Sequence, residues 1–128
     1  MNNNTLTFVS RILLSFMFIM SGLFKFGGIA GLAGYIGSVG LPAPTLLAWL
    51  AAIFEVVAGV MILVGFKTKL AAWALAAFCV FTGAVFHNNF GDQTQMIMFM
   101  KNFTIAGGFI LLAIHGAGSL SVDARNSE

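Results

Sequence analysis

The chain has 128 residues, of which 59% are hydrophobic and only 8% are charged. With a mean hydropathy of +0.99, this composition excludes an ordinary soluble domain and is typical of a membrane protein. The net charge of +2 comes without a dense basic cluster, so it indicates no nucleic-acid partner. The single cysteine, Cys79, excludes an internal disulfide.

Four apolar runs are long enough to cross a bilayer, whose core is about 30 Å thick and needs roughly 20 residues per helix. We expect the spans at residues 6–26, 45–66, 70–90 and 99–116, with a polar tail at 119–128 that lies on the inner surface or frays. The first run is too long for the apolar region of a signal peptide, so we interpret it as a retained span. The sequence therefore predicts one all-α domain over residues 1–128, an integral membrane four-helix bundle.

The basic residues are divided unequally between the two sides that four spans define. Four fall on the side of the termini and two on the other: Arg11, Lys67, Lys69 and Arg125 against Lys25 and Lys101. Because cytoplasmic loops are enriched in Lys and Arg, we predict that both termini lie in the cytoplasm.

The connection between the first two spans, GGIAGLAGYIGSVGLPAP, has glycine at every third position from 28 to 40. We expect a short interfacial helix whose glycine stripe faces the bundle. Gly40 and Pro42 should end it before the next span begins.

Glu55 interrupts the apolar run AWLAAIFEVVAGVMILVGF of the second span, near its middle. An ionisable group inside a bilayer costs at least a few kcal/mol, so it usually faces the bundle interior and a partner. Its neighbours at helical spacing are all small: Ala48, Ala51, Ala52, Ala58 and Gly59. Small residues let membrane helices approach closely, so we expect Glu55 to point into a helix interface.

Lys25 and His87 are the candidate partners of Glu55. Lys25 shares a face of the first span with Arg11, Ser15, Phe18 and Gly22, and His87 shares a face of the third with Ala72, Ala76 and Gly83. Side chains lean toward the N-terminus of their own helix, so the three polar groups lean toward one another across antiparallel spans. We therefore predict a polar cluster of Glu55, Lys25 and His87 in the outer half of the bundle.

Lys101 and Asn102, at the outer end of the fourth span, are candidates for the rim of the same site. Helix packing is assigned to the small residues of the spans: Gly22, Ala51, Ala58, Gly59 and Gly108. The run MIMFM offers thioether sulfurs, but flexible apolar filling explains it more simply than copper, so no metal is expected.

Each polar residue also has a purely structural interpretation. Glu55 would be a protonated carboxyl that holds helices together, Lys25 and Lys101 would be snorkelling helix-end residues, and His87 would be a satisfied interfacial histidine. The chain contains no phosphate loop, nucleophile elbow or metal-ligand spacing, so no catalytic residue is assigned.

Several stretches, in order and nearly end to end, resemble the DoxX family of small bacterial inner-membrane proteins. They are RILLSFMFIMSGLFKF, VGLPAP, FEVVAGVMILVGFKTKLAA, FHNNF, FMKNFTIAGGFILLAIHGAG and SLSVDA. The matching positions are Gly22, Lys25, Pro42, Glu55, Gly59, Gly65, Lys101, Asn102 and Asp123. Family members often read GPG where this chain has Gly116, Ala117 and Gly118.

The resemblance implies a four-helix protein of the bacterial inner membrane. Some relatives are named for a subunit of a quinol oxidase or of a thiosulfate:quinone oxidoreductase, and others are linked to membrane redox complexes. The family has no agreed catalytic residues, so the resemblance transfers none to this chain.

Three functions remain open from the sequence. The first is an accessory subunit of a membrane redox system that binds a quinone or another small molecule, with electrons supplied by a partner subunit. The second is a small proton-coupled transporter that uses Glu55. The third is an assembly subunit, or a homo-oligomer, whose small-residue faces bind other membrane helices.

Overall fold

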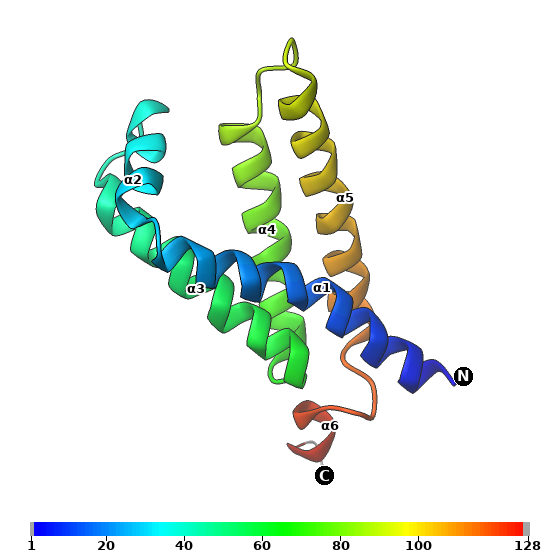
Figure 1. Ribbon diagram of the computed structural model, residues 1–128. Coiled ribbons are helices and arrows are strands. Elements are labelled where there is room, and N and C mark those ends of the chain that lie inside the picture. Colours follow the sequence, from blue (N-terminus) through cyan, green and yellow to red (C-terminus); the bar gives the residue numbers. More distant parts are fainter. Residues whose placement is uncertain (1, 127–128) are drawn as a thin grey trace.

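The computed structural model describes residues 2–126, and over that range it contains helices and connections but no strand (Figure 1). Its elements are α1 (Asn3–Phe26), α2 (Ile29–Ser38), α3 (Pro44–Val64), α4 (Thr68–Phe86), α5 (Gln93–His115) and α6 (Val122–Asn126). Helices α1, α3, α4 and α5 are long and apolar enough to cross a membrane. This confirms the predicted all-α protein with four spans.

The connection between α4 and α5 is shorter than the sequence suggested. Helix α4 ends at Phe86 instead of residue 90, and α5 begins at Gln93 instead of residue 99. The early start has a local cause, because the Asp92 side chain accepts a hydrogen bond of 2.9 Å from the backbone N–H of Thr94 and caps the helix. Residues 93–98, which fell between the expected spans, thus form the first turns of α5.

The four long helices form two closely packed antiparallel pairs, α1 with α3 and α4 with α5 (Figure 1). Helix α2 leans on α3. The pairs are joined by the short turn between α3 and α4 and separate toward α2 (Figure 1). We call the end with the α3–α4 turn the closed end and the end with α2 the open end.

Two glycines allow α1 and α3 to pack with their backbones close together. A Cβ atom at Gly22 would lie 2.9 Å from the carbonyl oxygen of Ala52, and one at Gly59 would lie 2.8 Å from Cγ1 of Ile19. Neither position accepts a side chain unless the helices move apart. Both glycines, to which the sequence analysis assigned a packing role, thus lie where α1 and α3 meet, and we call this contact the α1–α3 seam.

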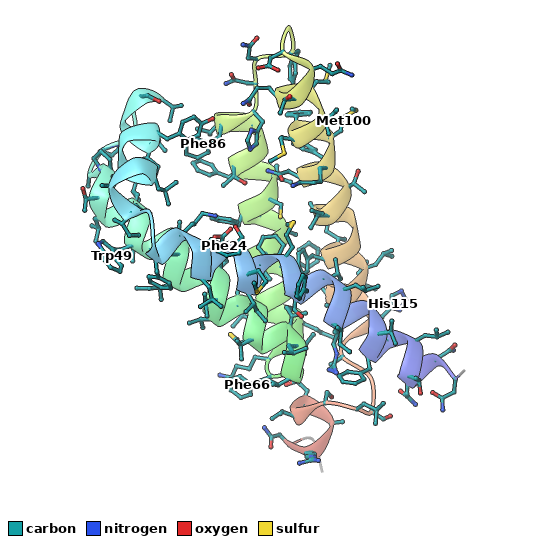
Figure 2. All side chains as sticks on the ribbon, viewed as in Figure 1. Phe24, Trp49, Phe66, Phe86, Met100 and His115 are labelled. Carbon is teal, nitrogen blue, oxygen red and sulfur yellow. The ribbon has the colours of Figure 1, made fainter. Side chains whose placement is uncertain are left out.

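The two helix pairs share an apolar core, and Figure 2 shows the side chains on the ribbon. The rings of Phe18 on α1 and Phe109 on α5 meet edge to face with centroids 5.5 Å apart, and those of Phe54 and Phe78 lie 5.1 Å apart. Ala58 is buried in this core. Gly108 provides room for Leu14 of α1, whose Cδ2 would lie 3.3 Å from a Cβ atom at position 108.

Helix α2 forms where it was predicted, but its glycine stripe does not face the bundle. Cβ atoms at Gly31 and Gly34 would meet nothing within 4 Å, whereas Ile36 is buried. The apolar side chains cover the neighbouring helices because they bury more surface than glycine does. Ala51, expected to pack between helices, is only half-buried and lines a cavity.

At the closed end the tail folds back onto the α3–α4 turn. The Asp123 carboxylate accepts hydrogen bonds from the backbone N–H groups of Lys67 (2.6 Å) and Thr68 (2.8 Å). The Asp123 N–H donates to the carbonyl of Gly65. Nη2 of Arg11, which is fully buried, donates to the carbonyl of Leu120. The tail as far as residue 126 is thus docked and does not fray, while its place on the inner surface stays a prediction. Residues 127 and 128 lie outside the described range.

Candidate functional site

A cleft of about 730 Å³ lies between the two helix pairs at the open end. Its walls are mostly apolar and carry the following polar residues: Ser21, Lys25, Tyr35, Glu55, Thr82, His87, Lys101 and Asn102. Small-molecule sites typically have volumes of about 300–1,000 Å³ and a few polar groups on apolar walls. All five polar residues that the sequence singled out line this one cleft.

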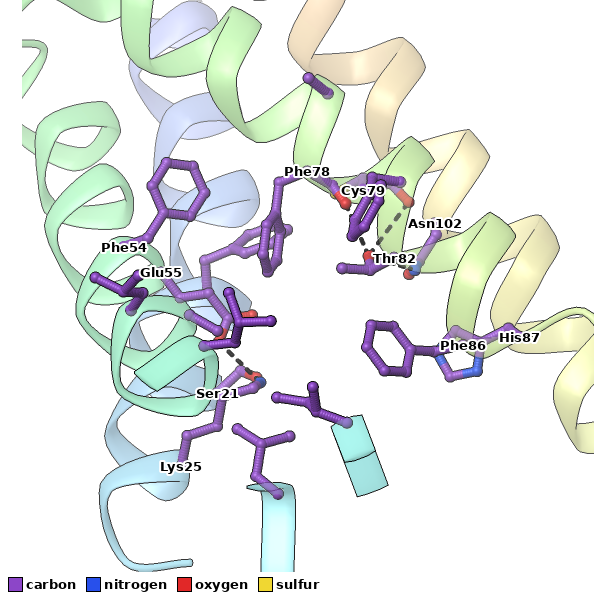
Figure 3. A pocket seen from close by; sticks show the side chains of 18 of the residues that line it. Ser21, Lys25, Phe54, Glu55, Phe78, Cys79, Thr82, Phe86, His87 and Asn102 are labelled. Atoms are coloured by element: carbon purple, nitrogen blue, oxygen red, sulfur yellow. Dashed lines mark hydrogen bonds and ion pairs between the residues drawn. The ribbon is translucent and has the colours of Figure 1, made fainter. Parts of the chain in front are cut away.

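The ion pair between Lys25 and Glu55 is the main polar feature of the cleft (Figure 3). Lys25 Nζ lies 2.8 Å from Glu55 Oε2, and it also donates a hydrogen bond of 2.8 Å to Ser21 Oγ. The Glu55 side chain is 6% exposed and that of Lys25 is 26% exposed. The carboxylate is therefore nearly enclosed, while the ammonium group reaches the cavity.

The sequence builds this pair locally. Ser21 precedes Lys25 by one helical turn, so both side chains lie on the same face of α1. The close α1–α3 seam, with Gly22 in it, brings Glu55 of α3 against that face. An ammonium group has three N–H donors, and Ser21 and Glu55 take two of them. No partner among the described residues is recorded for the third.

His87 lines the same cleft but lies across it from the ion pair (Figure 3). It is the C-cap residue of α4, and its Nδ1 lies 2.9 Å from Oε1 of Gln95 on α5. The structure thus brings together two members of the predicted three-residue cluster. The histidine is held separately on the opposite wall.

The α4–α5 wall carries a second polar group, formed by Thr82 and Asn102. Nδ2 of Asn102 donates to Oγ1 of Thr82 at 3.3 Å, and the threonine hydroxyl donates to the carbonyl of Phe78 at 2.8 Å. Gly83 gives Asn102 room, because a Cβ there would lie 3.2 Å from Cβ of Asn102. Lys101 also lines the cleft and is exposed.

Tyr35 connects α2 to α4 beside the cleft. Its hydroxyl donates a hydrogen bond of 2.9 Å to the carbonyl of Phe86, and the two rings stack with centroids 5.4 Å apart. Helix α2 is thereby tied to α4 of the other helix pair.

Sequence reasoning missed four polar residues of the site or its supports: Ser21, Tyr35, Thr82 and Gln95. Ser21 gave a usable signal, because it lies four residues before Lys25 on the same face. Tyr35 is the single tyrosine of the chain and stands in an otherwise apolar and glycine-rich segment. Thr82 and Gln95 act through partners on another helix or beyond a turn, so no local pattern marks them.

These observations define a class: a helical membrane protein with four spans and an apolar cleft whose wall carries a lysine–glutamate ion pair. The chain belongs to the DoxX family, whose family model matches residues 6–88. That match covers most of α1 and all of α2, α3 and α4, and it includes Lys25, Glu55 and His87.

Two inner-membrane proteins of Escherichia coli are similar over most of their length. YqjF is 43% identical over 115 residues, which cover 90% of this chain and 87% of YqjF. YphA is 39% identical over 126 residues, 94% of this chain and 89% of YphA. Together with the four spans, these relatives show that the chain is a multi-pass protein of the bacterial inner membrane, in contact with the lipid bilayer.

A more distant relative, CatD of Bacillus subtilis, carries the name of a candidate oxidoreductase. It is 33% identical over 64 residues, which cover 50% of this chain and 46% of CatD. No solved structure matches the chain.

Proposed function

We propose that the protein is an accessory subunit of an inner-membrane redox system and that its cleft binds a quinone or a similar small carbonyl compound. The observation that carries the proposal is the Lys25–Glu55 ion pair on the wall of an apolar cleft within the spans. The name of CatD supports the redox class, although that relative covers only half of this chain.

The chemistry of the pair suits a quinone ring. The free N–H of Lys25 can donate to a ring carbonyl, and the adjacent Glu55 can exchange a proton with that oxygen. Thr82 and Asn102 offer a second polar contact on the opposite wall. With the predicted orientation, the cleft would open in the outer half of the membrane.

Electrons would come from a partner subunit under this proposal. Iron–sulfur clusters are usually held by four cysteines and the sequence has one, so the proposal places no such cluster on this chain. Its part is to bind the ring and to exchange protons, next to other membrane redox subunits or to copies of itself.

The proposal is tested by measuring the affinity of the wild type and of the Lys25→Met variant for quinone in lipid nanodiscs. A hydrogen bond to a charged group is worth about 1.5–3 kcal/mol, so we expect at least a tenfold weaker affinity, since about 1.4 kcal/mol corresponds to a factor of ten. Lys69→Met removes a lysine at the closed end and should bind like the wild type. If the wild type takes up no quinone, or if Lys25→Met binds it equally well, the proposal is wrong.

Proton-coupled transport is the second candidate, favoured by a nearly enclosed carboxylate beside a cavity. It requires proton-linked substrate flux in proteoliposomes, and Glu55→Gln should abolish this flux. If the protein binds quinone but transports no substrate in this assay, only the first proposal remains.

A further inference from the structure

A second cavity, a groove of about 520 Å³, runs between α1 and α2. Four of its lining residues also line the cleft: Met17, Ser21, Lys25 and Leu32. The groove and the cleft therefore adjoin along α1 and share Lys25 in their walls.

The remaining lining of the groove is apolar or without a side chain: Phe16, Met20, Phe24 and Gly28. Phe16 and Phe24 are 65% and 73% exposed on a helix that spans the membrane, so they contact lipid. The groove thus leads from the polar group in the cleft to the acyl chains of the bilayer.

We propose that the ligand is a long-tailed membrane quinone, with its ring beside Lys25 and its isoprenoid tail in the α1–α2 groove. This inference rests on the proposed function and specifies its substrate class. A tail gains little hydrophobic free energy by moving from lipid to an apolar groove, because both surroundings are equally apolar. The groove therefore acts by shape, since it gives the tail a path from the ring at Lys25 out to the acyl chains.

The contacts of α2 support this direction of entry. Tyr35 ties α2 to Phe86 of α4 by a stacked ring and a hydrogen bond. No hydrogen bond or ring contact between α2 and α1 is found among the described side chains, and the two helices join through Gly27 and Gly28. Helix α2 is thus fastened on the α4 side of the cleft and borders an open groove on the α1 side.

Gly28→Leu tests the inference by filling the groove from a position outside the cleft. A Cβ atom at Gly28 would meet nothing within 4 Å, and its φ of −143° is accessible to any residue. Gly31→Leu is a matched control, because it also has open space at Cβ but lines neither cavity. Met20→Trp fills the same groove from α1, should Gly28→Leu disturb the start of α2.

Binding is measured in nanodiscs with two probes, a benzoquinone that carries a long isoprenoid tail and the same ring without a tail. The amount of each probe that is bound is corrected for the amount that nanodiscs without protein take up. We expect Gly28→Leu and Met20→Trp to weaken binding of the tailed probe by about tenfold or more through overpacking. Binding of the tail-less ring should be unchanged, and Gly31→Leu should affect neither probe.

The outcomes separate this inference from the function on which it rests. If the wild type binds neither probe, the proposed function fails and the inference with it. If both groove variants bind both probes normally, or if phospholipid displaces the tailed quinone from the wild type, the ring site stands and the assignment of the groove to the quinone tail is overturned.

Discussion

The two ends of the molecule each contain a cation within a spanning helix, but they surround it differently. At the closed end Arg11 is fully buried, donates to the Leu120 carbonyl and lies near Asp123. At the open end Lys25 is paired with Glu55 and faces a cleft. The chain itself encloses the first cation and leaves the second accessible.

This difference suggests that the Arg11 end of α1 stabilises the fold and the Lys25 end forms a site. Arg11 and Lys25 lie on one face of the same helix, with Ser15, Phe18 and Gly22 between them. The tail holds the helix pairs together at one end, so the other end can remain separated around a cavity without loss of the fold. A charge inside a bilayer is costly, and one that is left facing a cavity is a reason to look for a ligand there.

The largest expected effect comes from Gly22→Val, which should disrupt the α1–α3 seam and with it both the fold and the site at the open end. A Cβ at this position would lie 2.6 Å from Cγ2 of Val56 and 2.9 Å from the Ala52 carbonyl oxygen, so α1 and α3 must separate. We expect a loss of about 3 kcal/mol, measured by unfolding in mixed micelles with sodium dodecyl sulfate, together with loss of ligand binding.

Gly107→Val is the control for this change, because a Cβ there meets nothing within 4 Å. Equal stability of the two variants would show that the α1–α3 seam does not hold the fold.

Hydropathy and periodicity were sufficient for the four spans and for the position of Glu55 on a helix interface. The face of α1 from Arg11 to Lys25 was also predictable, because every polar or small residue on it follows helical spacing. The start of α5 was not, because it depends on one cap, Asp92, rather than on an average over many residues.

Only part of the site was predictable, because some of it follows from general helix geometry and the rest depends on specific contacts. The lean of side chains along antiparallel helices is a general property, and it was enough to pair Lys25 with Glu55. It could not show that the helix pairs diverge, which leaves His87 across the cleft and in contact with Gln95. The capping of α4 by Asp123 joins residues more than fifty positions apart, so no local pattern reveals it.

The next effect in size concerns the cation of the closed end. Arg11→Met keeps an unbranched apolar stem but removes the donor to Leu120 and the charge near Asp123. We expect the backbone N–H groups of Ser119 and Asp123 to exchange with solvent about ten times faster, because a hydrogen bond to a charged group is lost. Hydrogen exchange measured by mass spectrometry reports this opening.

Lys25→Met is the matched change at the open end. It should leave exchange in the tail unaltered, whereas it weakens ligand binding. If both variants loosened the tail, the two ends would be coupled rather than independent.

The smallest expected effect is the pH dependence of the closed end. Partial burial raises the pKa of the Asp123 carboxyl, but hydrogen bonds from Thr68 and Lys67 and the charge of Arg11 outweigh it, so the pKa is lowered overall. Because the folded pKa is below the unfolded value of about 3.9, the stabilisation is complete above that value. It is lost as the pH falls through the folded pKa.

Asp123→Asn should therefore destabilise the protein by about 0.5 kcal/mol at pH 7, the size expected for a charge at a helix N-terminus. The difference from the wild type should disappear in the acid range, because the wild-type carboxyl then becomes neutral as well. Lys69→Met should follow the wild-type pH profile throughout. A difference between Asp123→Asn and the wild type that stayed constant down to pH values below the folded pKa would mean that the charge of Asp123 is not what stabilises the tail.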